Sequence, residues 1–292
     1  MEPATSGSPG IELDDLVCTY GSKLVLKNLT ARVGSGECVA LFGRNGVGKS
    51  TLIRTLLGLK PPTSGRSYVF GFDTWSEGAK ARELIGFTPE IPVFPNRFTV
   101  RAVFDLLSDF FTQWDQGIAN ELSAMVKLSH SDRVGRLSKG NVVQLALIAA
   151  IARCPRILVL DEPFSSLDPV SRQSWQGVLR QVLSSKVETC LYSTHVVSDT
   201  EGLCNRVVIM SEGRFSHDFT VGCARPTYFR LQDATGRDEP PPVLGCSVVQ
   251  RDVGKQIVVV DQASVDELQQ WAEHNQIAIE SVTIADLIAG RN

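Results

Sequence analysis

A glycine-rich run at residues 43–50 has the residue types and spacing of a phosphate-binding loop. It reads GRNGVGKS, which fits the pattern G-x-x-x-x-G-K-[ST]. Glycines let the backbone curl so that successive N–H groups point at an anion. We expect Lys49 to reach the β- and γ-phosphates of a nucleotide and Ser50 to offer a hydroxyl to Mg²⁺. The loop residues predicted to contact the nucleotide are Gly43, Arg44, Asn45, Gly46, Val47, Gly48, Lys49, Ser50 and Thr51.

Two adjacent carboxylates follow the apolar run at residues 157–160. Asp161 is placed to hold Mg²⁺, directly or through water. Glu162 points differently because it is one residue further on, and it can accept a proton from an attacking water. Together with Lys49, this pair predicts an enzyme that hydrolyses a nucleotide phosphate. The guanine-reading pattern N-K-x-D is absent from the sequence, which argues against a GTPase.

The elements around these residues alternate between strands and helices. Apolar runs predict buried strands at 37–42, 156–160, 189–193 and 206–210, and helical spacing predicts helices at 49–59, 143–153 and 171–185. This alternation indicates an α/β core with a parallel sheet, in which ligands bind at the carboxyl ends of the strands. Segments 11–20 and 24–33 cluster β-formers and predict antiparallel strands.

Three other regions differ in texture from this core. Residues 1–10 are small and polar and predict a flexible tail. Apolar residues at helical spacing between about 94 and 142 predict an inserted helical segment. Residues 222–242 are rich in proline and predict a linker or long surface loop. Beyond it we expect strands at 256–261 and 277–282, a helix at 264–275 and a short last helix capped by Thr283, so 222–292 should form a small extension.

Composition sets limits on location and partners. The longest apolar stretch, residues 145–152, is far shorter than the ~20 residues of a bilayer-spanning helix, and residues 1–10 lack the features of a secretory signal. We therefore expect a cytoplasmic protein. The formal net charge of −3 argues against binding nucleic acid through bulk charge. Seven cysteines without Cys-x-x-Cys spacing predict reduced thiols and not a zinc site or a disulfide framework.

Further motifs, in this order along the chain, resemble those of ATP-binding subunits of ABC transporters. Tyr20 stands where that family stacks an aromatic ring on adenine, and residues 137–141 (LSKGN) resemble the signature LSGGQ. Residues 166–168 (SLD) resemble the D-loop, and His195 resembles the switch histidine. The resemblance covers roughly residues 11–215. It implies a P-loop NTPase core with a mainly parallel sheet, an N-terminal antiparallel β subdomain and a helical insertion, within an ATPase domain at 11–221.

The sequence departs from the family pattern at two motifs. Glu90 stands where the Q-loop usually has glutamine, and a carboxylate can approach Mg²⁺ or orient water but cannot donate through an amide. Lys139 and Asn141 replace glycine and glutamine in the signature, while Ser138 and Gly140 are retained. These features resemble exporter subunits that pair with a permease on a separate chain, often with a small C-terminal extension.

The resemblance implies two such subunits facing head to tail, as a homodimer or with a related subunit. Each ATP would lie between one subunit's phosphate loop and Ser138 and Gly140 of the other, whose helix N-terminus suits a phosphate. Glu162 would be the general base and His195 the γ-phosphate contact. Asp168 would connect the two sites, and the dimer would attach to the inner face of the membrane through its permease.

Other functions stay open at this stage. A soluble ABC-type ATPase for DNA maintenance would carry long coiled coils or zinc modules, and an ABC-type translation factor would carry two cassettes in one chain. A regulator that binds ATP without hydrolysing it would not need Lys49, Asp161, Glu162 and His195 together. For the extension, a packing or dimerisation role is favoured over a regulatory ligand site.

Overall fold

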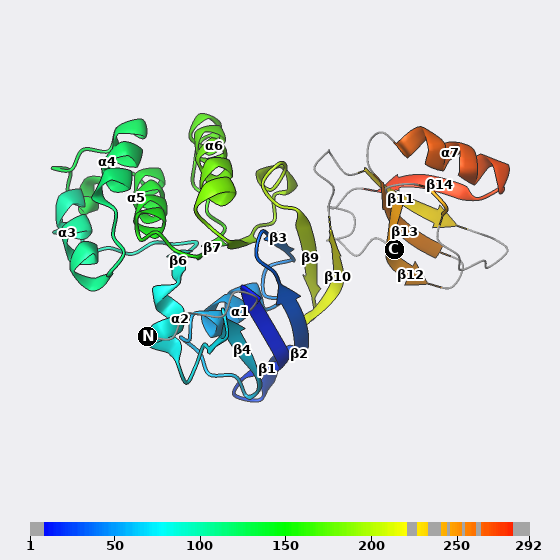
Figure 1. The fold of residues 1–292 in the computed structure, drawn as a ribbon, viewed down its shortest axis with the longest axis horizontal. Coiled ribbons are helices and arrows are strands. Elements are labelled where there is room, and N and C mark those ends of the chain that lie inside the picture. Colours follow the sequence, from blue (N-terminus) through cyan, green and yellow to red (C-terminus); the bar gives the residue numbers. More distant parts are fainter. Residues whose placement is uncertain are drawn as a thin grey trace.

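The computed structural model describes residues 9–220, 227–232, 241–243, 246–252, 255–260 and 264–282. Within these ranges the strands form three sheets, arranged along the molecule as Figure 1 shows. No helix in the described ranges has the length and apolar character needed to cross a bilayer.

The central sheet carries the loops that the sequence marks for chemistry. Its strand order is β10-β9-β3-β8-β7-β6, and neighbours pair in parallel except β10 with β9. Every residue of its three middle strands is buried, which explains their unbroken apolar sequences. The strands are β3 (Cys38–Phe42), β6 (Ile85–Thr88), β7 (Ile157–Asp161), β8 (Thr189–Ser193), β9 (Arg206–Ser211) and β10 (Arg214–Thr220).

A four-stranded antiparallel sheet covers one face of this core, as the sequence predicted for its first two strands. Its order is β2-β1-β4-β5, with β1 (Ile11–Tyr20), β2 (Lys23–Val33), β4 (Ser64–Val69) and β5 (Phe72–Asp73). Helix α1 (Lys49–Leu56) lies between the two sheets, and its Leu52 and Leu56 pack with Leu26 and Val159. This packing holds the start of α1 against the end of β3.

Helices cover the other face of the central sheet. The predicted insertion contains α3 (Val100–Phe110), α4 (Gln116–Met125) and the 3₁₀ turn Val134–Arg136. Helices α5 (Lys139–Ala152) and α6 (Pro169–Ser185) bury their side chains in the same core cluster as strand residues Leu158 and Tyr192. Helix α5 begins a few residues before the prediction because Ser138 caps it: its Oγ accepts from the Asn141 N–H at 3.1 Å. Helix α2 (Gly78–Glu83), β6 and β10 were not predicted.

The C-terminal part forms a third sheet, ordered β12-β13-β11-β14, with one helix. Its elements are β11 (Thr227–Gln232), β12 (Cys246–Asp252), β13 (Lys255–Val260), α7 (Val265–His274) and β14 (Ala278–Val282). The prediction of a linker throughout 222–242 was wrong, because β11 lies within it and pairs with both β13 and β14. The prolines at 226 and 240–242 flank this strand, and they led to the prediction of a linker or loop. The helix predicted after Thr283 lies outside the described residues.

This third sheet packs against neighbours on both of its faces. Leu231, Val258 and Val260 pack with Leu268 of α7. Ile257 and Val282 pack instead with Phe42, Ile209 and Phe219 of the central sheet. The extension therefore covers the end of the central sheet around β9 and β10, beside which it lies in Figure 1.

Candidate nucleotide site

The loop at residues 43–48 turns sharply between β3 and α1. Gly46 (φ 84°) and Gly48 (φ 120°) adopt backbone conformations that other residues rarely accept. A Cβ on Gly48 would also lie 2.8 Å from the Leu26 Cδ2 atom. No side chain caps the start of α1, so its first N–H groups point into the loop without a side-chain acceptor. An anion held there would satisfy them.

Lys49 is the first residue of α1 and is buried. Its Nζ donates to the Gly43 carbonyl oxygen at 2.5 Å and lies 3.5 Å from that of Arg44. The loop's own carbonyls therefore hold the ammonium above the curve of the loop. To reach a phosphate, the ammonium has to give up only these contacts with main-chain carbonyl oxygens.

Asp161 ends β7 and is buried at the carboxyl edge of the central sheet. Its Oδ1 accepts a hydrogen bond from the Ser193 hydroxyl at 2.7 Å. Burial raises the pKa of Asp161 more than hydrogen bonds from Ser193 and Ser50 lower it. A buried carboxylate of this kind gains free energy from a nearby cation, because the cation favours its charged form.

Glu162 adopts φ 48°, a strained conformation for a residue with a side chain. Its N–H donates to the Ser193 carbonyl oxygen at 3.0 Å, which anchors the turn to β8. Both carboxylate oxygens lie 2.9 Å from the Nδ1 atom of His195. The carboxylate is buried, whereas 61% of the His195 side-chain surface is exposed. The pair thus presents one buried proton acceptor and one exposed ring to the same space.

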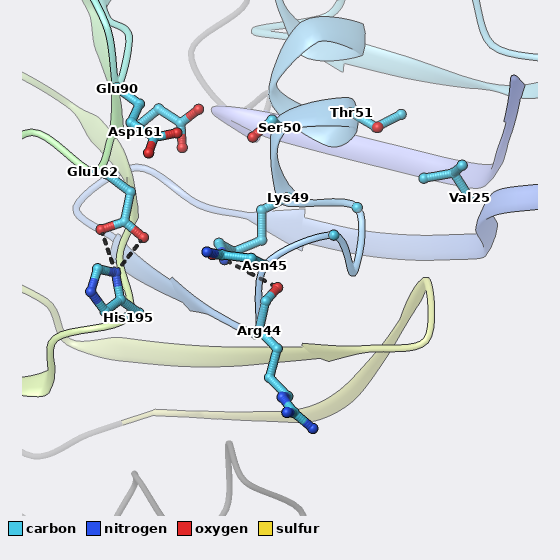
Figure 2. A pocket seen from close by; sticks show the side chains of 12 residues that line it. Val25, Arg44, Asn45, Lys49, Ser50, Thr51, Glu90, Asp161, Glu162 and His195 are labelled. Atoms are coloured by element: carbon cyan, nitrogen blue, oxygen red, sulfur yellow. Dashed lines mark hydrogen bonds and ion pairs between the residues drawn. The ribbon is translucent and has the colours of Figure 1, made fainter.

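These groups line one open cavity of about 270 Å³ (Figure 2). Its walls bring together the phosphate loop, both carboxylates and the predicted switch histidine. Glu90, which follows β6, lies in the same cavity as Ser50 and Asp161. Of the predicted loop residues, Arg44, Asn45, Gly46, Gly48, Lys49, Ser50 and Thr51 line it, whereas Gly43 and Val47 do not.

Sequence reasoning missed two residues around this cavity. Val25 of β2 forms an apolar part of the wall, and only its position shortly after Tyr20 hinted at that. Arg172 of α6 pairs with the buried Asp199 at 3.0 Å and donates to the Phe164 carbonyl oxygen at 3.2 Å. It therefore ties the loop after Glu162 to the segment after His195. A lone arginine in a helix gives no sequence signal for this.

Tyr20 lies at the end of β1 and does not line the cavity. Its ring is partly exposed, and the Lys60 ammonium lies 4.1 Å from the ring centroid. A cation at this distance is attracted by the face of the ring. The ring is therefore available at the edge of the site but apart from the phosphate-side groups.

The signature and D-loop residues form a second group outside the cavity. Ser138 is exposed and caps α5. Asp168 is exposed and caps α6, where its Oδ1 accepts from the N–H groups of Val170 and Ser171 at 3.0 Å each. Hydrogen bonds from Ser171 lower the pKa of Asp168. A Cβ on Gly140 would lie 3.2 Å from the Ser166 carbonyl oxygen, so the two motifs lie against each other.

Comparison with known proteins identifies the family. Residues 26–165 match the sequence profile of the family described as ABC transporter. The Nod factor export ATP-binding protein I of Rhizobium etli is 34% identical over 245 residues, which cover 82% of this chain and 72% of that protein. The chain belongs to the ABC transporter family of ATP-binding proteins. It is an ATP-binding subunit whose ATP hydrolysis drives transport, as the sequence predicted.

Solved structures confirm the predicted fold. An ATP-binding subunit of an ABC transporter has a TM-score of 0.67 at 27% identity, covering 72% of this chain and 89% of that one. A dimeric ATP-binding cassette in a post-hydrolysis state, bound to ADP and phosphate, has a TM-score of 0.65 at 22% identity, covering 73% and 99%. Cassettes of this family dimerise and typically pair with membrane permeases.

Proposed function

We propose that this chain is the ATPase of an exporter, acting at the inner face of the membrane as a head-to-tail dimer on a separate permease. The observation that carries this is the single cavity in which Lys49, Asp161, Glu162 and His195 meet. Export is supported by the names of the relatives, which are export ATP-binding proteins.

Each group in the cavity has a role that its surroundings support. The free N–H groups at the start of α1 and the Lys49 ammonium bind the β- and γ-phosphates. Glu162 is the general base for the attacking water, since it is buried and accepts from His195. The exposed His195 ring contacts the γ-phosphate. Tyr20 stacks on the adenine at the edge of the site.

The oxygen donors fit a magnesium ion. Mg²⁺ prefers one or two carboxylates together with phosphate oxygens and water. Ser50 and Asp161 would hold the ion, with Glu90 close by in the same cavity. When bound there, it would neutralise charge on the β- and γ-phosphates. Burial raises the pKa of Asp161, and a bound cation would stabilise the charged form of this carboxylate.

The second copy completes the site. Ser138, Gly140 and Asp168 lie at the starts of α5 and α6 and do not line this chain's own cavity. In a head-to-tail pair, Ser138 and Gly140 of one copy would face the γ-phosphate bound to the other. ATP then bridges the two copies, and hydrolysis releases them.

An apolar groove supports docking onto the permease. Residues 90–94, the 3₁₀ turn and the start of α5 line a cavity of about 610 Å³. Within it, Ile91 and Val93 are 77% and 86% exposed, which is costly unless a partner covers them. Because Glu90 lines both this groove and the nucleotide cavity, a docked permease segment would sense nucleotide state through the 90–94 loop.

The proposal includes a division of the chain into two parts. Residues 11–221 act as the ATPase domain, with the helical insertion at about 94–142, and 222–292 as an extension. The antiparallel sheet of the extension supports this division. Its contacts through Ile257 and Val282 favour a packing role.

Co-purification from detergent-solubilised membranes tests this proposal. We expect the tagged wild-type chain to retain a membrane permease, and Ile91→Asp with Val93→Asp to lose it. Leu59→Asp changes an apolar residue outside the groove that is also largely exposed (64%), and this variant should retain the permease. Recovery of wild-type chain without any membrane protein would contradict permease coupling.

A further inference from the structure

Three cysteine thiols meet at the edge of the central sheet opposite the nucleotide cavity. Cys38 begins β3, Cys190 lies in β8 and Cys204 precedes β9. The Sγ atoms of Cys38 and Cys204 are 3.2 Å apart. Cys38 and Cys190 are register partners on neighbouring strands. The mechanism of ATP hydrolysis uses none of these residues.

The backbone around the thiols is fixed by its own hydrogen bonds. The Cys38 N–H donates to Asn205 Oδ1 at 2.9 Å, and the Asn205 N–H donates to the Cys38 carbonyl oxygen at 3.0 Å. These two bonds hold Cys204 beside Cys38. A disulfide has an S–S length of about 2.0 Å, so the two sulfur atoms need to approach by only about 1 Å.

The two thiols also differ in ways that suit a reaction between them. Hydrogen bonds from Cys190 first, and then from Cys204, lower the pKa of Cys38 to about 5 despite its burial. A thiolate is the reactive form of cysteine. Cys204 is half-buried and is the least buried residue of the three. Cys190 is fully buried, and its thiol is hydrogen bonded to that of Cys38.

We propose that hydrogen peroxide converts Cys38 and Cys204 into a reversible disulfide. The Cys38 thiolate attacks one peroxide oxygen and breaks the O–O bond, which gives a sulfenic acid and hydroxide that leaves as water. The Cys204 sulfur then attacks the Cys38 sulfur and expels the hydroxyl group, which takes up the Cys204 proton and leaves as a second water. Two thiols lose two electrons, and one peroxide becomes two water molecules.

The expected consequence is a more stable fold with an unchanged nucleotide site. The bond would close a loop from residue 38 to residue 204, and closing a long loop lowers the entropy of the unfolded chain. The phosphate loop and His195 lie at the other ends of β3 and β8. Oxidation should therefore raise the melting temperature by roughly 5–10 °C and leave the affinity for ATP within about twofold.

Peptide mass spectrometry of the full chain tests the site. The reduced protein is treated with hydrogen peroxide, alkylated and digested without reductant. We expect a peptide pair joined through Cys38 and Cys204 with a loss of two hydrogens, which dithiothreitol separates. Cys204→Ser should abolish it, whereas Cys154→Ser should not, because the Cys154 thiol lies outside this cluster and contacts the Ala152 carbonyl oxygen at 3.9 Å.

Three results would overturn the proposal. One is a cross-link through a different pair, including Cys38 with Cys190. Another is sulfinic or sulfonic acid at Cys38 or Cys204 without a cross-link. The third is an equal rise in melting temperature for Cys204→Ser after peroxide, which would assign the effect to other residues.

Discussion

The nucleotide cavity and the exposed starts of α5 and α6 are held in place in different ways. We call the second region, which carries Ser138, Gly140 and Asp168, the signature face. In the cavity, both carboxylates are fixed by residues from other segments: Asp161 by Ser193, and Glu162 by His195. On the signature face, Ser138 and Asp168 hydrogen bond, within the described part of the chain, only to the helices they begin, α5 and α6. The first region is one half of the ATP site, and the contacts within a single chain complete it; we call it the finished half-site. The second presents exposed groups that have no substrate until another copy supplies one.

This contrast predicts that one chain alone can bind ATP but cannot hydrolyse it efficiently. Tertiary contacts preorganise the phosphate side, so its groups need no partner to take up their positions. Helix caps preorganise the other side locally and leave its surface open. Changes in the cavity should therefore act on every chain alone, and changes on the signature face only on the pair.

The largest expected effect is that of Glu162→Gln. Because the amide cannot accept the proton of the attacking water, turnover should fall about 10²–10⁴-fold, while ATP binding persists. The variant should accumulate as an ATP-bound dimer. Steady-state phosphate release and light scattering measure the two effects.

Glu212→Gln is the matched control for this change. Glu212 has the same left-handed backbone (φ 48°) but lies exposed in the turn between β9 and β10. We expect it to turn over like wild type. Near wild-type hydrolysis by Glu162→Gln would show that the finished half-site lacks the base we assign.

Next in size is Lys49→Ala, which removes the ammonium held by the loop. Loss of a charged hydrogen bond to phosphate costs about 1.5–3 kcal/mol, so ATP affinity should fall roughly 10–100-fold. Isothermal titration on the chain at low concentration measures this without dimerisation. Lys80→Ala removes an exposed pair with Glu77 and a contact with the Phe72 ring, neither of which belongs to the cavity, and it should bind ATP like wild type. Equal affinities for all three proteins would remove Lys49 from the phosphate site.

Ser138→Asp tests the other side of the comparison. Aspartate caps a helix as well as serine, so α5 should remain intact. Its charge would repel the γ-phosphate presented by the second copy. Turnover should fall about tenfold, with unchanged ATP affinity for the isolated chain. The uncharged cap in Ser138→Asn should cost less, and an affinity loss in the isolated Ser138→Asp chain would place Ser138 in its own cavity.

The residues predicted for the phosphate side line one cavity because they follow strands whose apolar sequences are easily recognised. Buried apolar runs lead directly into the phosphate loop, into Asp161 and toward His195, and parallel strands bring their ends to one edge. Glu90 lines the cavity although its strand β6 was not predicted, since the motif and not the periodicity pointed to this residue. Prolines misled the reading of 222–242, because β11 is stabilised by pairing on both sides. Long-range pairing of this kind leaves no local signal.

Contacts between side chains were the other limit. The spacing of residues did not predict that Arg172 contacts both Asp199 and the Phe164 carbonyl oxygen. Likewise, Tyr20 was predicted from its place in the chain, but the Lys60 ammonium over its ring was not. Such pairs depend on how helices and strands pack against one another. Their partners have no characteristic separation along the sequence, so one sequence does not reveal them.

Tyr20→Ala should give the smallest effect and tests where the cavity ends. Stacking on an aromatic ring contributes about 0.5–1.5 kcal/mol, so ATP affinity should fall roughly 2–10-fold. Inorganic triphosphate has no base to stack, and its affinity should not change. Tyr20→Phe keeps the ring and should bind both ligands like wild type. If Tyr20→Ala weakened triphosphate as much as ATP, the ring would support the phosphate loop instead of the base. The finished half-site would then extend beyond the cavity walls to β1.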